Sequence, residues 1–134
     1  MTDYSNAALA TKLGVKETST VVLVHAPSDF QLGVGSGVQV RRQTRGPADV
    51  VVAFFTKSAS LEHEIEKLSR SITPSGGLWI VWPKKASNVA TDMTDHVVRA
   101  IALPLGLVDN KVCAIDAIWT GLRLVWRVSA RAKL

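Results

Sequence analysis

The chain has 134 residues, which is the size of one ordinary domain with a single hydrophobic core. Hydrophobic residues make up 47% of it and charged residues 20%, and this balance excludes an intrinsically disordered chain. The formal net charge of +5 favours anionic partners, but a charge of this size does not by itself indicate nucleic-acid binding.

The amino-terminal half is predicted to contain a short helix followed by three strands. Residues 5–13 are expected to form the helix, with Ser5 as its N-cap and Gly14 at its end. The three strands are expected at Thr20–His25, Val38–Arg42 and Asp49–Phe55. The first and third are almost entirely apolar, which is typical of strands covered on both faces. The glycine-rich run 33–37 precedes a strand, whereas a dinucleotide-binding loop follows one, so we interpret it as a turn.

The middle of the chain is predicted to form a helix, a strand and a second helix. Ser58–Ile72 is the clearest helix, because its apolar residues recur at spacings of four, three and four. Those residues are Leu61, Ile65, Leu68 and Ile72. Leu78–Trp82 is expected to be a buried strand, and a second helix capped by Thr91 or Asp92 is expected to end before Pro104. The side of this second helix predicted to be buried consists of Met93, Val97, Ala100 and Ile101.

The carboxy-terminal part is predicted to form a hairpin. Its two strands, Lys111–Trp119 and Leu122–Val128, are joined by Thr120–Gly121, a short connection. In that register Asp116 lies opposite Val125 and diagonal to Arg123 and Arg127. Such a cross-strand charge cluster has a structural explanation, so no catalytic role is expected for Asp116.

Alternation of buried strands with helices predicts one α/β domain over residues 1–134. We expect a mostly parallel sheet with helices on both faces and an antiparallel hairpin at its carboxy-terminal end. Cys113 is the only cysteine, which excludes an internal disulfide framework and fits a reducing compartment. The amino terminus lacks the pattern of a secretion signal, and no apolar run approaches the ~20 residues that a membrane helix needs. We therefore expect a cytoplasmic protein with no membrane partner.

The order of these elements resembles the class I (Rossmann-like) S-adenosylmethionine-dependent methyltransferase fold, best from Asp49 to Val128. The phrase ITPSGGLWIV is particularly similar to the L-x-P-G-G turn before the fifth strand of that fold. The resemblance implies a six-stranded sheet in the order 2-1-3-4-6-5, with strand 6 antiparallel. It also implies a truncated fold, which lacks one helix–strand–helix segment between VQVRR and ADVVV.

Most of the chain also resembles a set of short bacterial proteins, the family called domain of unknown function 3052. Four phrases carry this second resemblance: YSNAALATKLGVK, VRRQTRGPADVVVAF, GGLWIVWPKKAS and IALPLGLVDNKVCAIDAIWTGLR. The family resemblance implies a fold but no activity.

Two determinants of S-adenosylmethionine binding are missing from the sequence. The turn after the first strand of that fold is rich in glycine, because the backbone must approach the ligand closely there. Here residues 25–30, HAPSDF, contain no glycine. The second strand of that fold ends in an acidic residue that accepts hydrogen bonds from ribose hydroxyls, whereas Arg41 and Arg42 can only donate. We therefore expect no cofactor and favour a non-catalytic function.

Basic residues follow the ends of all four predicted parallel strands. Ligands of open α/β sheets bind outside these carboxyl ends, so we predict a ligand site there. Its residues are His25, Arg41, Arg42, Lys57, Trp82, Lys84 and Lys85. Arginine forks and lysine charges suit a phosphate, and the indole of Trp82 offers a face on which a base can stack. The alternative is that these strand ends simply meet solvent, where lysine and arginine are common.

Three functions remain open on the sequence alone. The first is a non-catalytic domain that binds an anionic small molecule, such as a nucleotide or a phosphorylated metabolite. Nucleic acid is a weaker variant of it, because the basic residues are spread along the chain. The second is a protein-interaction or homo-oligomerisation module that uses the hairpin near Trp119, and the third is a degenerate methyltransferase. The three histidines and one cysteine lie far apart in sequence and match no metal-binding pattern.

Overall fold

The computed structural model describes residues 9–44 and 46–131. These residues form a six-stranded sheet in the order β2-β1-β3-β4-β6-β5, which confirms the predicted order. The strands are β1 (Thr20–Val24), β2 (Gln39–Arg41), β3 (Ala48–Phe54), β4 (Ile72–Pro83), β5 (Leu107–Ala114) and β6 (Trp119–Trp126). The helices are α2 (Ser58–Arg70), α3 (Asp95–Ala102), α4 (Val128–Arg131) and the 3₁₀ turns η1 (Lys85–Ser87) and η2 (Leu103–Leu105).

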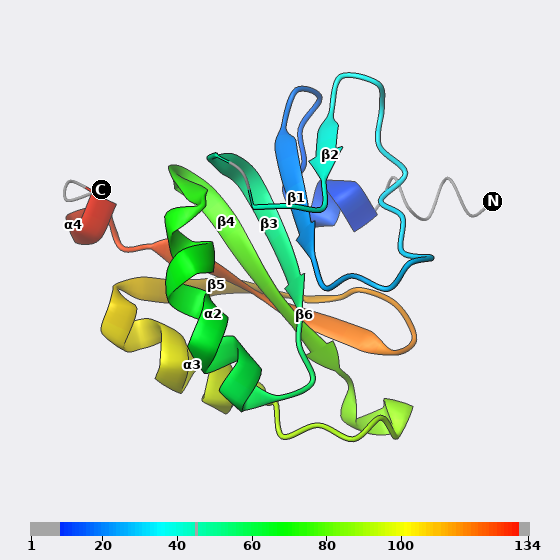
Figure 1. Cartoon of the computed structure of the whole chain (residues 1–134), viewed down its shortest axis with the longest axis vertical. Helices are drawn as coiled ribbons and strands as arrows, with labels where there is room; N and C mark the ends of the chain where they lie inside the picture. The colour runs from blue at the N-terminus through cyan, green and yellow to red at the C-terminus, as the bar shows by residue number, and fades with distance from the viewer. Residues whose placement is uncertain (1–8, 45, 132–134) are drawn as a thin grey trace.

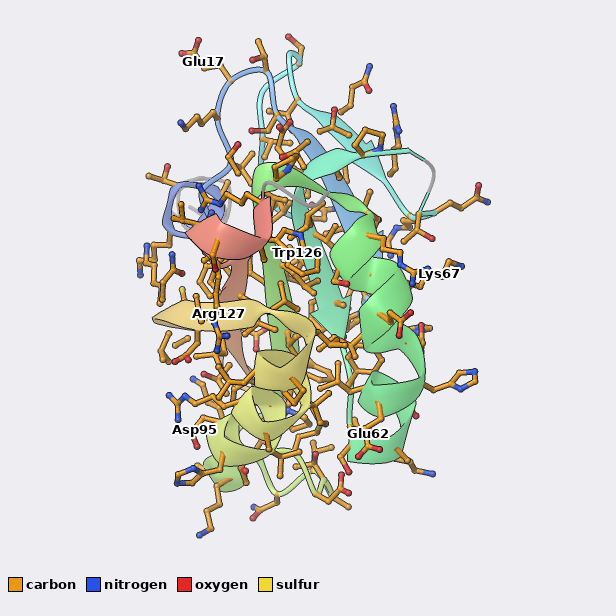
Figure 2. All side chains as sticks on the ribbon, turned by 90° about the vertical axis from the view of Figure 1, so that its left-hand side faces the viewer. Glu17, Glu62, Lys67, Asp95, Trp126 and Arg127 are labelled. Carbon is orange, nitrogen blue, oxygen red and sulfur yellow. The ribbon has the colours of Figure 1, made fainter. Side chains whose placement is uncertain are left out.

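The sheet is mixed, with three parallel and two antiparallel pairings, and β6 is the antiparallel strand, as expected. β1 pairs in parallel with β2 and β3, and β3 pairs in parallel with β4. β6 runs antiparallel to both β4 and β5. The ends of β1 to β4 and the β5–β6 loop therefore lie at one edge, here called the carboxyl edge, and the starts of β1 to β4 lie at the opposite amino edge. Figure 2 shows Glu62 and Asp95 at the carboxyl edge and Glu17 at the other end of the molecule.

The helices α2 and α3 lie side by side against one face of the sheet (Figure 1). The apolar stripe of α2 is buried as predicted, through Leu61, Ile65 and Leu68. The helix ends at Arg70, because Ile72 already pairs with Ala48 as the first residue of β4. This face holds the larger of the two clusters of buried side chains.

The predicted start of α3 is wrong, and of its predicted buried side Ile101 packs, partly buried, against the core. The helix begins at Asp95, and the hydroxyl of Thr94 caps it by accepting the N–H of Val97 at 3.1 Å. Its buried residues are Val98 and Ala102. Met93 is buried as well, but it precedes the helix, so helical spacing counted from Met93 places the wrong residues inward.

The second face of the sheet is covered, among the described residues, by one short helical stretch and by irregular chain. Residues 9–12 are helical and Gly14 follows at φ +85°, as predicted for the end of this helix, while Ser5 lies outside the described residues. The segment from Pro27 to Val38 covers the rest of this face as irregular chain, through Phe30, Leu32 and Val34. Residues 9–19, here called the leading segment, are held against the sheet by Trp79, whose indole N–H donates to the carbonyl of Leu13 at 2.9 Å.

The β2–β3 connection is very short for strands that lie on either side of β1. It spans residues 42–47, of which the described ones, 42–44 and 46–47, form neither helix nor strand. A crossover between parallel strands ordinarily takes a dozen residues or more. β2 is accordingly only three residues long, because a longer β2 would carry the chain farther from the start of β3. All three of its residues are exposed.

The predicted turn of the closing hairpin is wrong. The strands are joined by residues 115–118, and Thr120 and Gly121 lie within β6, opposite Trp82 and Val81 of β4. Gly121 packs closely on Trp79, since an added Cβ would lie 3.1 Å from Cε3 of that indole. Asp116 instead accepts the N–H groups of Ile118 and Trp119 within the loop, so the expected charge cluster around Asp116 does not form. None of the helices in the described part of the chain is long and apolar enough to cross a membrane.

Candidate functional site at the carboxyl edge

The predicted basic residues lie at the carboxyl edge but do not converge. Arg41 and Arg42 follow β2, whereas Lys84 and Lys85 follow β4, and β1 and β3 lie between these strands. With neighbouring strands ~4.8 Å apart, the two pairs are separated by about 14 Å across the sheet. Of the seven predicted residues, Trp82 and Lys85 do line one cavity, of about 310 Å³, and Asp95 lies in its wall.

His25 faces helix α2 rather than a ligand site. Its Nε2 lies 2.9 Å from Oε1 of Glu64, and its ring meets Phe55 edge-on with the centroids 5.5 Å apart. Its backbone adopts φ +56°, a left-handed conformation that glycine reaches without strain. The turn after β1 thus takes up a conformation that glycine favours, although it contains no glycine. The imidazole of His25 pairs with Glu64, a partner that the sequence did not indicate.

The other predicted residues are tied into the fold or lie in solvent. Trp82 is only 7% exposed and belongs to the core under α2 and α3, so its indole face is not an open stacking platform. The backbone N–H of Lys84 donates to the carbonyl of Ile118 at 2.7 Å and joins β4 to the β5–β6 loop. A guanidinium nitrogen of Arg42 lies 3.5 Å from the carbonyl of Phe30, and Lys57 precedes α2 without capping it by its side chain.

The cap of α2 comes from Asp92, which the sequence suggested as a cap of the next helix. Oδ1 of Asp92 accepts the N–H of Ser58 at 2.8 Å, and Oδ2 accepts its hydroxyl at 2.6 Å. These hydrogen bonds, the one from the Ser58 hydroxyl most strongly, hold the pKa of Asp92 below its ordinary value. A carboxylate at a helix N-terminus also offsets the partial positive charge there.

We expect an Asp92→Asn variant to be less stable than the wild type at neutral pH and to converge with it in acid. The folded-state pKa is lower than the unfolded one, so the stabilisation is present above the ordinary aspartate pKa of ~3.9 and is lost as pH falls through the folded value. Thermal melts of both proteins from pH 7 to pH 3 measure this. Glu62→Gln, which alters an exposed carboxylate of α2, serves as control and should melt in parallel with the wild type. A gap of constant size between Asp92→Asn and wild type would contradict the assignment.

A second, larger cavity at this edge, here called the edge pocket, has a volume of about 550 Å³. It lies between the chain that follows β1 and the β5–β6 loop. Its lining residues are Leu9, Pro27, Asp29, Phe30, Gln31, Ile115, Asp116, Ile118 and Trp119. The strand order reverses beside it, between β1 and β3, which is where open α/β sheets bind ligands.

Aromatic rings and carboxylates dominate the chemistry of the edge pocket. Phe54, the last residue of β3, meets Phe30 and Trp119 edge-on, with ring centroids 5.0 and 5.1 Å apart. Asp29 and Asp116 supply two exposed carboxylates, and no lysine, arginine or histidine is among the lining residues in the described part of the chain. The sequence did not predict this pocket, because its residues come from three distant segments with no shared spacing and because the predicted hairpin register placed Asp116 elsewhere.

Several solved structures to which this chain is similar in fold are methyltransferases. A SAM-dependent methyltransferase from Aquifex aeolicus has a TM-score of 0.63 and 17% identity, and the match covers 89% of this chain and 88% of that one. A putative type 11 methyltransferase from Sulfolobus solfataricus has a TM-score of 0.59 and 12% identity, with 92% of both chains covered. Magnesium protoporphyrin IX methyltransferase from Synechocystis PCC 6803, solved with bound SAM, has a TM-score of 0.60 and 11% identity, with 93% of this chain and 77% of that one covered.

These likenesses show a class I methyltransferase-like fold and, at such low identity, the fold alone. No family model matches the chain, and no curated protein matches it. The resemblance to domain of unknown function 3052 therefore stays a prediction. Within the described residues, no group of three or more histidine, cysteine, aspartate or glutamate side chains is placed to hold a metal ion. The residues of this chain thus form an α/β domain of the methyltransferase-like class with an acidic, aromatic pocket at its carboxyl edge.

Proposed function

We propose that this domain binds a small ligand with a planar apolar body and a positive charge in the edge pocket. The observation that carries the proposal is the pairing of Phe30 and Trp119 with two carboxylates in a cavity whose described lining residues include no cationic side chain. Aromatic faces attract cations, and carboxylates attract cations and accept hydrogen bonds from hydroxyl groups. An anionic ligand would meet repulsion from Asp29 and Asp116 in the same place.

S-adenosylmethionine is the first candidate for this ligand. It combines an adenine ring, ribose hydroxyls and a positively charged sulfonium, and the similar protoporphyrin methyltransferase structures hold SAM or SAH. The sequence argument against this cofactor rests on the turn at residues 25–30 and on Arg41 and Arg42. The edge pocket offers other contacts, with Asp29 as acceptor and Phe30 and Trp119 as apolar walls. The short β2–β3 connection supports a truncated version of the fold, and we assign no reaction to it.

Calorimetric titration of the full chain with adenosyl ligands tests this proposal. We expect S-adenosylmethionine to bind more tightly than S-adenosylhomocysteine, because only the first carries the sulfonium charge. Asp29→Asn should weaken the binding of S-adenosylmethionine by up to about fivefold, since exposed ion pairs are worth ~0.2–1 kcal/mol. The affinity for S-adenosylhomocysteine should change less. Glu62→Gln makes the same charge change on α2, outside the pocket, and should leave both affinities unaltered.

Binding of neither adenosyl ligand would end the assignment to S-adenosylmethionine. ATP and inorganic phosphate are included in the titrations because the sequence favours an anion held by Lys84 and Lys85. If ATP binds more tightly than S-adenosylmethionine and a Lys84→Ala/Lys85→Ala variant loses that binding, the domain binds an anionic ligand at these lysines and the proposed cationic ligand is wrong. Short RNA, added as a further titrant, tests the weaker nucleic-acid variant of that alternative in the same way.

A second candidate function is association of two chains through the edge strand β5. Val112 of β5 is 63% exposed, and Ile118 in the adjoining loop is exposed as well. The outer edge of such a strand offers unpaired backbone groups to a partner strand, although Lys111 on the same strand is of the kind that discourages pairing. Native mass spectrometry of the titrated samples distinguishes the two candidates, because a strictly monomeric mass argues against association.

A further inference from the structure

A small polar cavity lies at the amino edge, at the opposite end of the sheet from the edge pocket. Its volume is about 170 Å³, and it opens between the segment before β1 and the start of β4. Its lining residues are Gly14, Lys16, Ser19, Asp49, Val50, Thr73, Ser75, Gly76 and Arg123. Figure 2 shows Glu17, which neighbours Lys16 in the chain, at this end of the molecule. We call this cavity the amino-edge pocket.

The guanidinium of Arg123 is the main positive charge of the amino-edge pocket. Its Nε is buried and donates to no acceptor among the described residues. Arg123 forms no ion pair within 4.0 Å with a carboxylate of the described residues, whereas Arg70 and Arg99 each form at least one. Burial lowers the pKa of Arg123, although arginine stays charged at neutral pH. A half-buried charge without a partner is costly, so such a group calls for a specific reason.

Glycine at position 77 makes room for this guanidinium. A Cβ at Gly77 would lie 2.5 Å from Nε of Arg123 and 2.8 Å from its Cζ and Nη2. Arg123 pairs with Trp79 of β4, so its side chain extends over Gly77 on the face covered by the leading segment. The side chain of Arg123 is therefore seated in the protein and not extended into solvent.

A bulge in β4 forms the second wall of the amino-edge pocket. The register with β3 shifts from Ala48↔Ile72 to Val50↔Gly77, so Thr73 to Gly76 bow out of the ladder. Oγ1 of Thr73 is buried there and has no hydrogen-bond partner in the described part of the chain. A Cβ at Gly76 would lie 2.8 Å from the carbonyl oxygen of Asp49 and from Thr73 Oγ1, so only glycine fits. Bulges of this kind often re-aim polar groups at functional sites.

The remaining charges leave the amino-edge pocket positive. Lys16 adds a second cation at its mouth. Asp49 supplies the one carboxylate found among the described lining residues, and its Oδ2 already accepts the N–H of Thr20 at 2.8 Å. Two cations face one engaged carboxylate, and two buried polar atoms, Arg123 Nε and Thr73 Oγ1, have hydrogen-bonding capacity to spare.

We infer that the amino-edge pocket binds a small oxyanion such as inorganic phosphate or the phosphate of a small phosphomonoester. The fork of Arg123 binds two oxygens of the anion, the hydroxyl of Thr73 donates to it, and Lys16 supplies charge at the mouth. Guanidinium groups match phosphate in this way, with paired, charge-assisted hydrogen bonds. This site is independent of the ligand proposed for the carboxyl edge, because the two pockets lie at opposite ends of the strands.

Thermal melts and calorimetry of the full chain with inorganic phosphate test this inference. Phosphate and sulfate should raise the melting temperature above that in chloride of equal ionic strength, and glycerol phosphate tests the monoester source. Arg123→Gln should weaken phosphate binding at least tenfold, because hydrogen bonds to charged groups are worth ~1.5–3 kcal/mol each. Arg127→Gln removes the same charge from an exposed position just beyond β6 and should bind phosphate like the wild type (Figure 2). In chloride, Arg123→Gln should be at least as stable as the wild type, since it removes an unpaired charge.

Lys16→Gln provides a second test that does not depend on how well Arg123→Gln folds, because Lys16 is exposed. It should weaken phosphate binding by a few fold. Amide chemical shifts recorded during the phosphate titration locate the anion, with changes expected at Ser75 and Gly76. No stabilisation by phosphate beyond chloride would overturn the inference. Shift changes confined to Lys84–Ser87 would overturn it too, as would equal affinities of the wild type and Arg123→Gln.

Discussion

Replacing Trp79 by alanine is expected to lower the free energy of unfolding by roughly 3 to 5 kcal/mol, the range for large aromatic residues in well-packed cores. Trp79 is fully buried in the middle of β4 and packs in the cluster on the face opposite α2 and α3. Its indole N–H also donates to the carbonyl of Leu13, across 66 residues of chain. The substitution therefore removes core packing and detaches the leading segment from the sheet.

A Trp79→Phe variant separates these two contributions. Phenylalanine keeps much of the apolar burial but cannot donate, and a buried acceptor left without its donor costs about 1–3 kcal/mol. We expect Trp79→Phe to fall between wild type and Trp79→Ala in urea denaturation. Hydrogen exchange of the amides near Leu13 should speed up in both variants. Unchanged exchange there in Trp79→Phe would contradict the structural role assigned to the indole N–H.

Replacing Trp82 by alanine is expected to have the second largest effect, a loss of about 3 kcal/mol or more. The sequence suggested that Trp82 presents its face to a ligand, whereas the structure buries it to 7% exposure among the residues under α2 and α3. An open stacking platform could be truncated with little loss of stability, because surface substitutions ordinarily change it by no more than ~0.5 kcal/mol. The unfolding free energy of Trp82→Ala therefore decides between the two interpretations.

The matched control for Trp82→Ala is the Lys84→Ala/Lys85→Ala variant, which alters the same strand end outside the core. Its unfolding free energy should stay within ~0.5 kcal/mol of the wild type. If Trp82→Ala is as stable as this control, the burial of Trp82 is wrong, and the ligand role predicted from the sequence regains its basis. Urea titrations followed by far-ultraviolet circular dichroism allow the comparison, because they report unfolding without depending on the fluorescence of the replaced indole.

Local patterns in the sequence predicted the elements well where one physical rule dominated. The apolar run that became β3 can only be a doubly covered strand, and the four-three-four spacing in α2 places Leu61, Ile65 and Leu68 on one face of a helix. The strand order 2-1-3-4-6-5 came from resemblance and is confirmed. The start of α3 was misplaced because Thr91, Asp92 and Thr94 all suit an N-cap. Thr94 is the residue that caps α3, whereas the carboxylate of Asp92 binds Ser58 of α2.

The sequence by itself determined the α/β class of fold, the buried strands β1 and β3 and the main helix, because periodicity and apolar runs are local properties of the chain. It missed the first six residues of β4 and the bounds of β5. Only the tertiary structure decided the register of the closing hairpin, since that register depends on how Gly121 packs against Trp79 of a distant strand. That register places Asp116 in the edge pocket and Arg123 over Gly77, so both candidate sites depend on it. Their residues meet through strand pairing between segments far apart in sequence, and no local pattern records such a meeting.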